Sequence, residues 1–221
     1  MNVAMILAAG ESRRMGRPKQ LLPFGDKTML ECVIDAFRTP RVDEILVVLG
    51  HKAEEILAKL ESGVTDGHRR RAEPARPTNG TVGRGALAAP QVKTVKNLHY
   101  RQGMFTSVQT GLRALPKEAT LVMTALCDQP RLQRKTVEEL VGEFEKKQHK
   151  ILIPTHEGRQ GHPLLFRAEY AKEILALDES LTLKHFLAAH AGDVARLPVA
   201  DEGVLMDIDE RADYERARRK R

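Results

Sequence analysis

Apolar runs that alternate with amphipathic segments constrain the fold of this chain more than any other feature of its sequence. The runs 3–7, 44–50 and 120–126 are apolar except at Glu44, Thr120 and Thr124, which is typical of strands buried on both faces of a parallel sheet. A weaker strand is expected at 92–97. Apolar residues recur at helical spacing in four further segments, 28–37, 53–61, 106–115 and 135–147. This order predicts an α/β fold with a doubly wound, Rossmann-like, mostly parallel sheet in three α/β/α layers, whose ligands gather beyond the carboxyl ends of the strands.

The C-terminal part of the chain continues the pattern less regularly. We expect strands at 150–155, 163–166, 194–199 and 204–208, helices at 168–177 and 181–190, and a final charged helix from about Glu210. No linker separates these elements from the rest, so we predict one domain over residues 1–221. Residues 63–91 break the pattern because they are rich in Gly, Pro, Arg and Thr without apolar periodicity, and we expect a mobile surface insertion there.

The charge and cysteine content argue against several classes of protein. The 36 basic and 30 acidic residues give a formal net charge of +6, which favours anionic partners but is modest for a dedicated nucleic-acid-binding protein. Cys32 and Cys127 stand far apart and outside any zinc-binding spacing, so we predict reduced thiols in a cytoplasmic protein. The N-terminal apolar run lacks the charged start of a signal peptide, and no stretch approaches a membrane span.

A cationic, glycine-containing loop follows the first predicted strand, in the sequence LAAGESRRMGRPK. Gly10 lets the backbone approach a ligand closely, and the turn presents free N–H groups to an anion. Arginine grips phosphate oxygens with a planar fork and lysine adds a movable point charge, here as Arg13, Arg14, Arg17 and Lys19. The loop has neither the GxGxxG pattern of dinucleotide-binding folds nor the Gly-Lys-Ser/Thr of a Walker A loop. It therefore indicates a polyphosphate site, the alternative being a basic surface turn.

Three aspartates that follow predicted strands are candidate metal ligands. Asp128 comes directly after the strand 120–126, and Asp209 stands at the end of 204–208. Asp207 would share a strand face with Asp209, because side chains alternate with a two-residue period. Mg²⁺ prefers hard oxygen ligands and often takes one or two carboxylates together with substrate phosphates. A Mg²⁺ site is thus expected, the alternatives being that Asp128 is a turn residue and Asp209 a helix cap.

Five stretches carry a resemblance to a known family. They are LAAGESRRMGRPK, NLHYRQGMFTSVQTGL, CDQP, GHPLLF and DIDERADY, in this order along the chain. The first matches the signature LxxGxxxRMGxxK, and together they resemble the MobA-like NTP transferases, among which the chain looks most like the molybdenum cofactor cytidylyltransferase group. The resemblance implies a fold of the nucleotide-diphospho-sugar transferase type. It also implies transfer of CMP from CTP to the phosphate of a molybdopterin-type cofactor, with Mg²⁺ bound and pyrophosphate released.

Two features of the chain depart from that family pattern. Residues 63–91 have no counterpart in it, and DIDERAD stands where DIDTPED is common, so the Thr-Pro pair is missing while both aspartates remain.

The resemblance implies that the first loop binds the nucleotide. Its backbone would line the base and ribose at Leu7, Ala8, Ala9 and Gly10. Arg14 and Lys19 would meet the triphosphate and the departing pyrophosphate, with Arg13 and Arg17 peripheral. Arg14, Lys19 and Asp128 would be the catalytic residues. The AAG sequence, in place of AGG, is associated with cytidine, and alanines leave less room for a purine than glycine would.

Two further motifs have both a functional and a structural interpretation. By resemblance, Gly161, His162 and Pro163 lie beside the acceptor substrate, whereas His162 taken alone is a hydrogen-bonded structural histidine. Gly103 and Ser107 stand near the start of the helix 106–115, where they would bind nucleotide or only cap the helix.

No strong general base is expected, because a phosphomonoester is already largely dianionic at neutral pH. Catalysis would rest on in-line positioning and charge neutralisation. The alternatives are GTP in place of CTP, a sugar or alcohol phosphate as acceptor, or a carrier that holds the cofactor without turnover. A different class, a nucleic-acid-binding protein, would rest on the basic runs 68–77 and 216–221. We expect CTP and the molybdenum cofactor as partners, a molybdoenzyme or its chaperone as recipient, and neither nucleic acid nor membrane.

Overall fold

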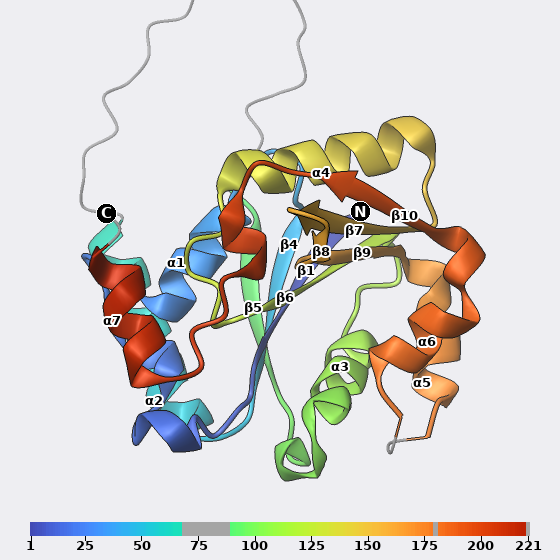
Figure 1. The fold of residues 1–221 in the computed structure, drawn as a ribbon. Coiled ribbons are helices and arrows are strands. Elements are labelled where there is room, and N and C mark those ends of the chain that lie inside the picture. Colours follow the sequence, from blue (N-terminus) through green and yellow to red (C-terminus); the bar gives the residue numbers. More distant parts are fainter. Residues whose placement is uncertain (68–88, 179–180, 220–221) are drawn as a thin grey trace, which may run out of the picture.

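A computed structural model describes residues 1–67, 89–178 and 181–219 of the chain (Figure 1). Its central sheet has the strand order β10-β7-β9-β6-β1-β4-β5. The strands are β1 (Asn2–Ala8), β4 (Glu44–Leu49), β5 (Gln91–Lys96), β6 (Leu121–Leu126), β7 (Ile151–His156), β9 (Leu164–Arg167) and β10 (Val194–Pro198). β1 runs parallel to β4 and β6, β4 to β5, and β7 to β10, whereas β9 is antiparallel to both of its neighbours. The predicted mostly parallel, doubly wound sheet is confirmed.

Helices cover both faces of this sheet because its central strands are apolar on both sides. Along β1, Ala4 and Ile6 join one buried cluster while Met5 and Leu7 join the other, which is the two-residue alternation of a strand. The first cluster receives α1 (Met29–Ala36), α2 (Ala53–Gly67) and α4 (Arg134–Lys147). The second receives α3 (Met104–Arg113), α5 (Ala171–Ala176) and α6 (Leu183–Ala189) (Figure 1). The predicted three layers are therefore present.

The last helix, α7 (Arg211–Arg219), packs beside the first loop of the chain. Between them lies a small antiparallel ribbon made of β2 (Pro23–Phe24) and β3 (Lys27–Thr28). Tyr214 and Phe24 are buried in one cluster there, and the Tyr214 hydroxyl donates to the carbonyl of Pro23. The Nε of Arg131 donates to the carbonyl of Ala217 at 3.2 Å and fixes the end of the helix. These contacts hold α7 against the segment that follows the first loop and against the turn after β6.

The predicted strand at 204–208 is wrong, since this segment begins in a short 3₁₀ turn at Glu202–Leu205 and continues as irregular chain. Asp201 favours the turn, because its carboxylate accepts from the backbone N–H of Gly203 at 2.9 Å and from that of Gln133 at 2.9 Å. Val204 is buried in the first core cluster and Ile208 beside Tyr214, although neither belongs to a strand. Ile208 is tied to the site through its N–H, which donates to the carbonyl of Asp128 at 3.0 Å.

Two other boundaries differ from the prediction. α3 begins at Met104 instead of residue 106, and its N-cap is Gly103, whose φ of 123° favours glycine. Thr106 does not cap the helix, because its hydroxyl donates to the carbonyl of Gly103 at 2.9 Å. Of the expected insertion 63–91, residues 63–67 belong to α2, residues 68–88 lie outside the described residues, and β5 begins at Gln91. A short strand, β8 (Arg159–Gln160), pairs with β7.

Candidate active site

Three segments that are distant in sequence meet at the carboxyl end of the central strands. The pairing of β1 with β6 sets Leu7 opposite Leu126, so the loop after β1 and the turn after β6 leave the sheet side by side. Asp128 belongs to that turn. The segment before α7 crosses the same edge, because the N–H of Ile208 bonds to the carbonyl of Asp128. Asp209 therefore comes to lie near both.

Lys19 links the two acidic segments. Its Nζ donates to Oδ2 of Asp128 and, at 3.2 Å, to Oδ1 of Asp209. The side chains of Lys19 and Asp128 are only 14% and 13% exposed, whereas that of Asp209 is 55% exposed. Burial lowers the pKa of Lys19, but the charge and hydrogen bond of Asp128 outweigh it, so the pKa lies above its ordinary value. The ammonium group therefore stays protonated at neutral pH and lies between two carboxylates.

Gln20 holds the first loop in shape and was missed in the sequence. It is fully buried, and its amide donates to the carbonyls of Ala8 at 2.8 Å and Gly10 at 3.1 Å. The hydroxyl of Ser12 donates to the Gln20 amide oxygen at 3.4 Å and accepts from the N–H of Lys19 at 3.0 Å. A single glutamine in a basic loop carries no periodic signal, so only the folded chain reveals it. Its effect is to fix the path of the loop between the strand end and Lys19.

A cavity of about 470 Å³ lies over this loop. It is lined by Gly10, Glu11, Ser12, Arg13, Arg14, Lys19, Tyr100, Arg101 and Asp209. Arg13 and Arg101 are both paired with Glu11, at 2.5 and 3.3 Å, and so are restrained at the cavity wall. Arg14 is 70% exposed and lies 3.8 Å from Glu210, which leaves it free to move toward a ligand. The excess of cations suits a polyanion, as predicted for this loop; the part of Arg101 in it was not foreseen.

The acidic residues beside the cavity fit a divalent cation. Oδ1 of Asp128 is buried and has no hydrogen-bond partner, so a hard cation would satisfy it. Asp209 lies close to Asp128, because both carboxylates accept a hydrogen bond from Nζ of Lys19. Asp207 accepts from the amide of Gln129 at 2.8 Å, and burial, followed by the charge of Asp128, raises its pKa. The expectation that Asp207 lies on a strand is wrong. In the described ranges no group of three or more Asp, Glu, His or Cys side chains is positioned to hold one metal ion.

A second, more apolar cavity of about 260 Å³ opens at the end of β1. Leu7, Gly103, Thr124 and His162 are among the residues that line it. Burial lowers the pKa of His162, partly opposed by the charge of Asp128, so the imidazole is neutral at physiological pH. The hydroxyl oxygen of Thr124 is buried here without a partner.

The remaining predicted residues support these cavities without lining them. Gly161 is required for packing, because a Cβ there would lie 2.3 Å from the carbonyl oxygen of Val204, and Pro163 is buried beside it. Ala8, Ala9 and Ser107 are buried and line neither cavity. Asn97, also missed in the sequence, donates to the hydroxyl of Ser107 at 2.9 Å and so fixes the start of α3.

Gly50 and Cys127 have structural roles at the same edge of the sheet. A Cβ on Gly50 would come within 2.8 Å of both the Cβ and the carbonyl oxygen of Ala9, so the end of β4 can approach the loop only with glycine. Burial raises the pKa of Cys127 to about 12, which agrees with a packed thiol and not a nucleophile.

Comparison with known proteins places the chain among nucleotide-handling enzymes. The sequence profile described as "MobA-like NTP transferase domain" matches residues 4–194. The molybdenum cofactor cytidylyltransferase of Escherichia coli is 24% identical over 95% of this chain and 92% of its own length. A probable molybdenum cofactor guanylyltransferase of Mycobacterium marinum is likewise 24% identical, over 95% and 89%. Nicotine blue oxidoreductase of Paenarthrobacter nicotinovorans is 28% identical over 93% and 90%.

Some matches cover only part of a longer protein. The bifunctional protein GlmU of Clostridium tetani is 43% identical over 63 residues, which is 28% of this chain and 14% of that protein.

Solved structures share the fold over nearly the whole chain. The Rv0371c protein of Mycobacterium tuberculosis superposes with a TM-score of 0.72 and 26% identity, over 98% of this chain and 96% of that one. A manganese complex of the same protein gives a TM-score of 0.68 and 24% identity, over 99% and 98%. The fold therefore belongs to a known architecture.

Proposed function

Since the chain belongs to the MobA-like NTP transferase family and is a nucleotidyltransferase, we propose that it transfers CMP from CTP to the phosphate of a molybdopterin-type cofactor. Pyrophosphate is the second product. The same site would serve GTP or a sugar or alcohol phosphate, and the experiment below separates these substrates. The protein is proposed to act in the cytoplasm, on small molecules.

One observation carries the proposal. Lys19, Asp128 and Asp209 come from three remote segments and meet beside a basic loop at the carboxyl end of β1 and β6. Such a group has a cation for the phosphates and carboxylates for a metal ion, and it holds no Ser, Cys or His nucleophile with an adjacent base. Phosphoryl-type transfer between two phosphates needs only these groups.

The residues of the site then have distinct tasks. The acceptor phosphate attacks the α-phosphorus of the nucleotide, a new P–O–P bond forms, and the bond to the β-phosphate oxygen breaks to release pyrophosphate. Lys19 and Arg14 neutralise the charge that develops on the phosphate oxygens, which is where preorganised cations contribute most to the rate. For Lys19 this requires its ammonium group to leave the carboxylates of Asp128 and Asp209 and turn toward the triphosphate.

Those carboxylates would hold a divalent cation once Lys19 has turned. Nucleotidyltransferases of this family commonly use a divalent metal ion, and one structural neighbour is a manganese complex. We propose Mg²⁺, held by Asp128 and Asp209, with Asp207 behind them. When bound, the ion supplies Lewis-acid charge to the phosphate oxygens.

Base and acceptor are both assigned to the end of β1. The base would lie along the backbone of residues 7–10, near Ser107. The apolar cavity with Leu7, Gly103 and His162 would receive the acceptor, since a fused-ring pterin suits apolar walls with a few polar groups. A neutral His162 and the unpartnered hydroxyl of Thr124 are the groups able to hydrogen-bond it.

The test is to identify the nucleotide product. The protein is incubated with molybdopterin-type cofactor, Mg²⁺ and labelled CTP or GTP, and the dinucleotide and pyrophosphate are quantified; a sugar phosphate replaces the cofactor in a parallel reaction. We expect a cytidine dinucleotide and equimolar pyrophosphate. Lys19→Met should abolish both, whereas Lys27→Met, which removes a lysine paired with Asp35 outside the cavity, should leave both unchanged.

Three results would overturn parts of the proposal. Product from GTP alone changes the base, and product from a sugar phosphate alone changes the acceptor. Absence of pyrophosphate with every pair of substrates, from folded protein, would refute nucleotidyl transfer. Tight binding of duplex or single-stranded nucleic acid at physiological salt in a gel-shift assay would favour the nucleic-acid-binding alternative.

A further inference from the structure

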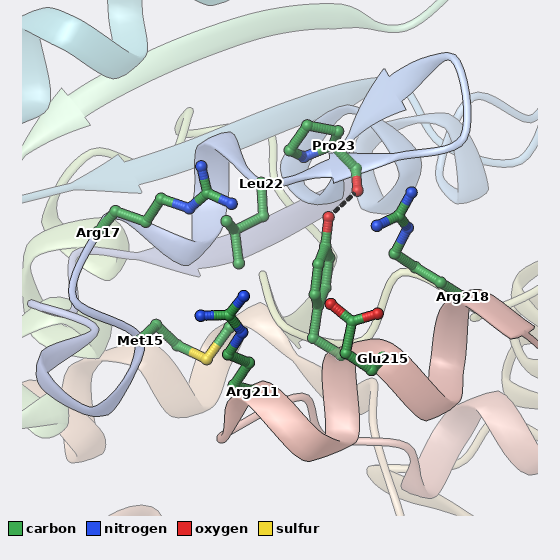
Figure 2. A pocket seen from close by; sticks show the side chains of 8 residues that line it. Met15, Arg17, Leu22, Pro23, Arg211, Glu215 and Arg218 are labelled. Atoms are coloured by element: carbon green, nitrogen blue, oxygen red, sulfur yellow. Dashed lines mark hydrogen bonds between the residues drawn. The ribbon is translucent and has the colours of Figure 1, made fainter.

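A second basic cavity lies between the first loop and α7, and the proposed reaction does not use it. Its volume is about 350 Å³ (Figure 2). It is lined by Met15, Arg17, Leu22, Pro23, Arg211, Tyr214, Glu215 and Arg218. None of these residues lines the cavity over Lys19, although both cavities draw residues from the loop and from the segment around Asp209.

The arginines of this cavity differ from most others near the loop. Within the ranges that the structure describes, Arg17, Arg211 and Arg218 form no ion pair, and Glu215 forms none with them. Neighbouring arginines do find acids: Arg13 pairs with Glu11 and Arg216 pairs with Asp213. Arg218 lies over the ring of Tyr214, 5.5 Å from its centroid, so three positive charges line the cavity against the single negative charge of Glu215. An anion would relieve the repulsion between the arginines.

The walls of the cavity give these charges an apolar base. Leu22 and Tyr214 are buried in the cluster that joins the loop to α7, and Met15 packs against it. Tyr214 is fixed by its hydrogen bond to the carbonyl of Pro23 (Figure 2). Figure 2 shows the guanidinium groups of Arg17 and Arg211 on the side of Leu22 and Met15, and that of Arg218 on the side of Pro23 and Glu215. The three arginines are themselves exposed, so an anion reaches them from solvent while Leu22 and Tyr214 form the floor of the cavity.

We infer that this cavity is a second site for a phosphate-bearing small molecule, with Arg17 and Arg211 as the phosphate ligands. Two guanidinium forks offer more donors than the two oxygens of a single carboxylate can accept, whereas a terminal phosphate has three oxygens and up to two charges. Arg218 lies across the Tyr214 ring and is placed for a second charged group. Pyrophosphate, which carries two phosphates, is therefore expected to bind more tightly than inorganic phosphate.

The inference can be tested by calorimetric titration with pyrophosphate, inorganic phosphate and CMP as separate ligands. We expect Arg17→Gln and Arg211→Gln each to weaken pyrophosphate binding at this site at least tenfold. Arg219→Gln is the matched control, because it removes the same charge one residue beyond Arg218 and does not line the cavity; it should change the affinity less than twofold. Binding by Lys19→Met should persist, since Lys19 belongs to the other cavity.

The ligands distinguish the sources of the phosphate. Tighter binding of CMP than of pyrophosphate identifies an organic phosphomonoester as the ligand, and the reverse order identifies an inorganic polyphosphate. Binding that is equal in Arg211→Gln and Arg219→Gln, or that disappears entirely in Lys19→Met, would overturn the inference. Because no turnover is measured, these outcomes do not depend on whether the protein transfers a nucleotide.

Discussion

Replacing Lys19 by methionine should have opposite effects on turnover and on the binding of free metal ion. The substitution removes the charge and nearly preserves the length of the side chain. In the free protein the ammonium group donates to Asp128 and Asp209, so a divalent cation that approaches these carboxylates must first displace it. We therefore expect Lys19→Met to bind Mn²⁺ more tightly than the wild type in the absence of nucleotide, while it loses pyrophosphate release.

The exposure of the side chains sets the size of the effect. A hydrogen bond to a charged group contributes roughly 1.5–3 kcal/mol. The contact of Lys19 with Asp128 counts almost fully because the two side chains are 14% and 13% exposed, whereas Asp209 is 55% exposed and its contact is largely screened by solvent. Displacing one full contact corresponds to roughly 10–100-fold in Mn²⁺ affinity. Loss of a cation that stabilises the transition state lowers kcat by roughly 100–1000-fold.

The effect on metal binding should hold across the neutral pH range. The pKa of Lys19 is raised, so the stability that the pair contributes is present below the ordinary lysine pKa and is lost only as pH rises through the higher folded value. Mn²⁺ binding can be followed by the decrease of the free-ion signal in electron paramagnetic resonance. Lys27→Met is the control, because Lys27 pairs with Asp35 and neither residue lines any of the three cavities. Unchanged or weaker Mn²⁺ binding by folded Lys19→Met would show that the lysine does not compete with the metal.

Three other substitutions test the acidic group and the support of the loop. Asp128→Asn should lose Mn²⁺ binding and lower pyrophosphate release by roughly 100–1000-fold while the far-ultraviolet circular dichroism stays unchanged; retention of Mn²⁺ affinity would exclude this residue as a ligand. Gln20→Leu leaves the carbonyls of Ala8 and Gly10 without their hydrogen-bond donor. It should lower the free energy of unfolding, measured by urea titration, by about 1–3 kcal/mol and raise the KM for the nucleotide. An unchanged urea midpoint and KM would show that the loop does not need the Gln20 amide. Asp207→Asn should raise Tm at neutral pH, because burial raises the pKa of this carboxyl and its charged form destabilises the fold. That gain should be full above the raised folded pKa, shrink as pH falls through it and vanish below the ordinary aspartate pKa. A gain independent of pH would contradict the assignment.

The pattern of apolar residues was sufficient for the sheet and its helices. β1, β4 and β6 are buried on both faces, and each was visible as a run made almost wholly of apolar residues. The segment 204–208 was also largely apolar but did not form a strand, since Asp201 holds the chain in a 3₁₀ turn over Glu202–Leu205. The burial of these segments thus followed from their composition. Whether a segment paired as a strand depended on neighbours that are distant in sequence.

Some residues of the candidate site could likewise be predicted from the sequence, and others could not. The basic loop and Asp128 could be predicted from residue type and position, because a strand end followed by a turn places side chains at the ligand-binding edge. Gln20, Asn97 and Arg101 could not, since each acts through a partner that only folding brings near. The same is true of Arg17 and Arg211, which stand almost 200 residues apart and line one cavity.

The sequence by itself determined that the chain forms a layered α/β fold with cations after its first strand, because periodicity and charge are properties of neighbouring residues. Only the tertiary structure decided that Lys19 lies between Asp128 and Asp209 and that a second group of arginines faces α7. The physical reason is that electrostatic interactions depend on distance in space and on burial, and both are set by the packing of the parallel strands and the last helix.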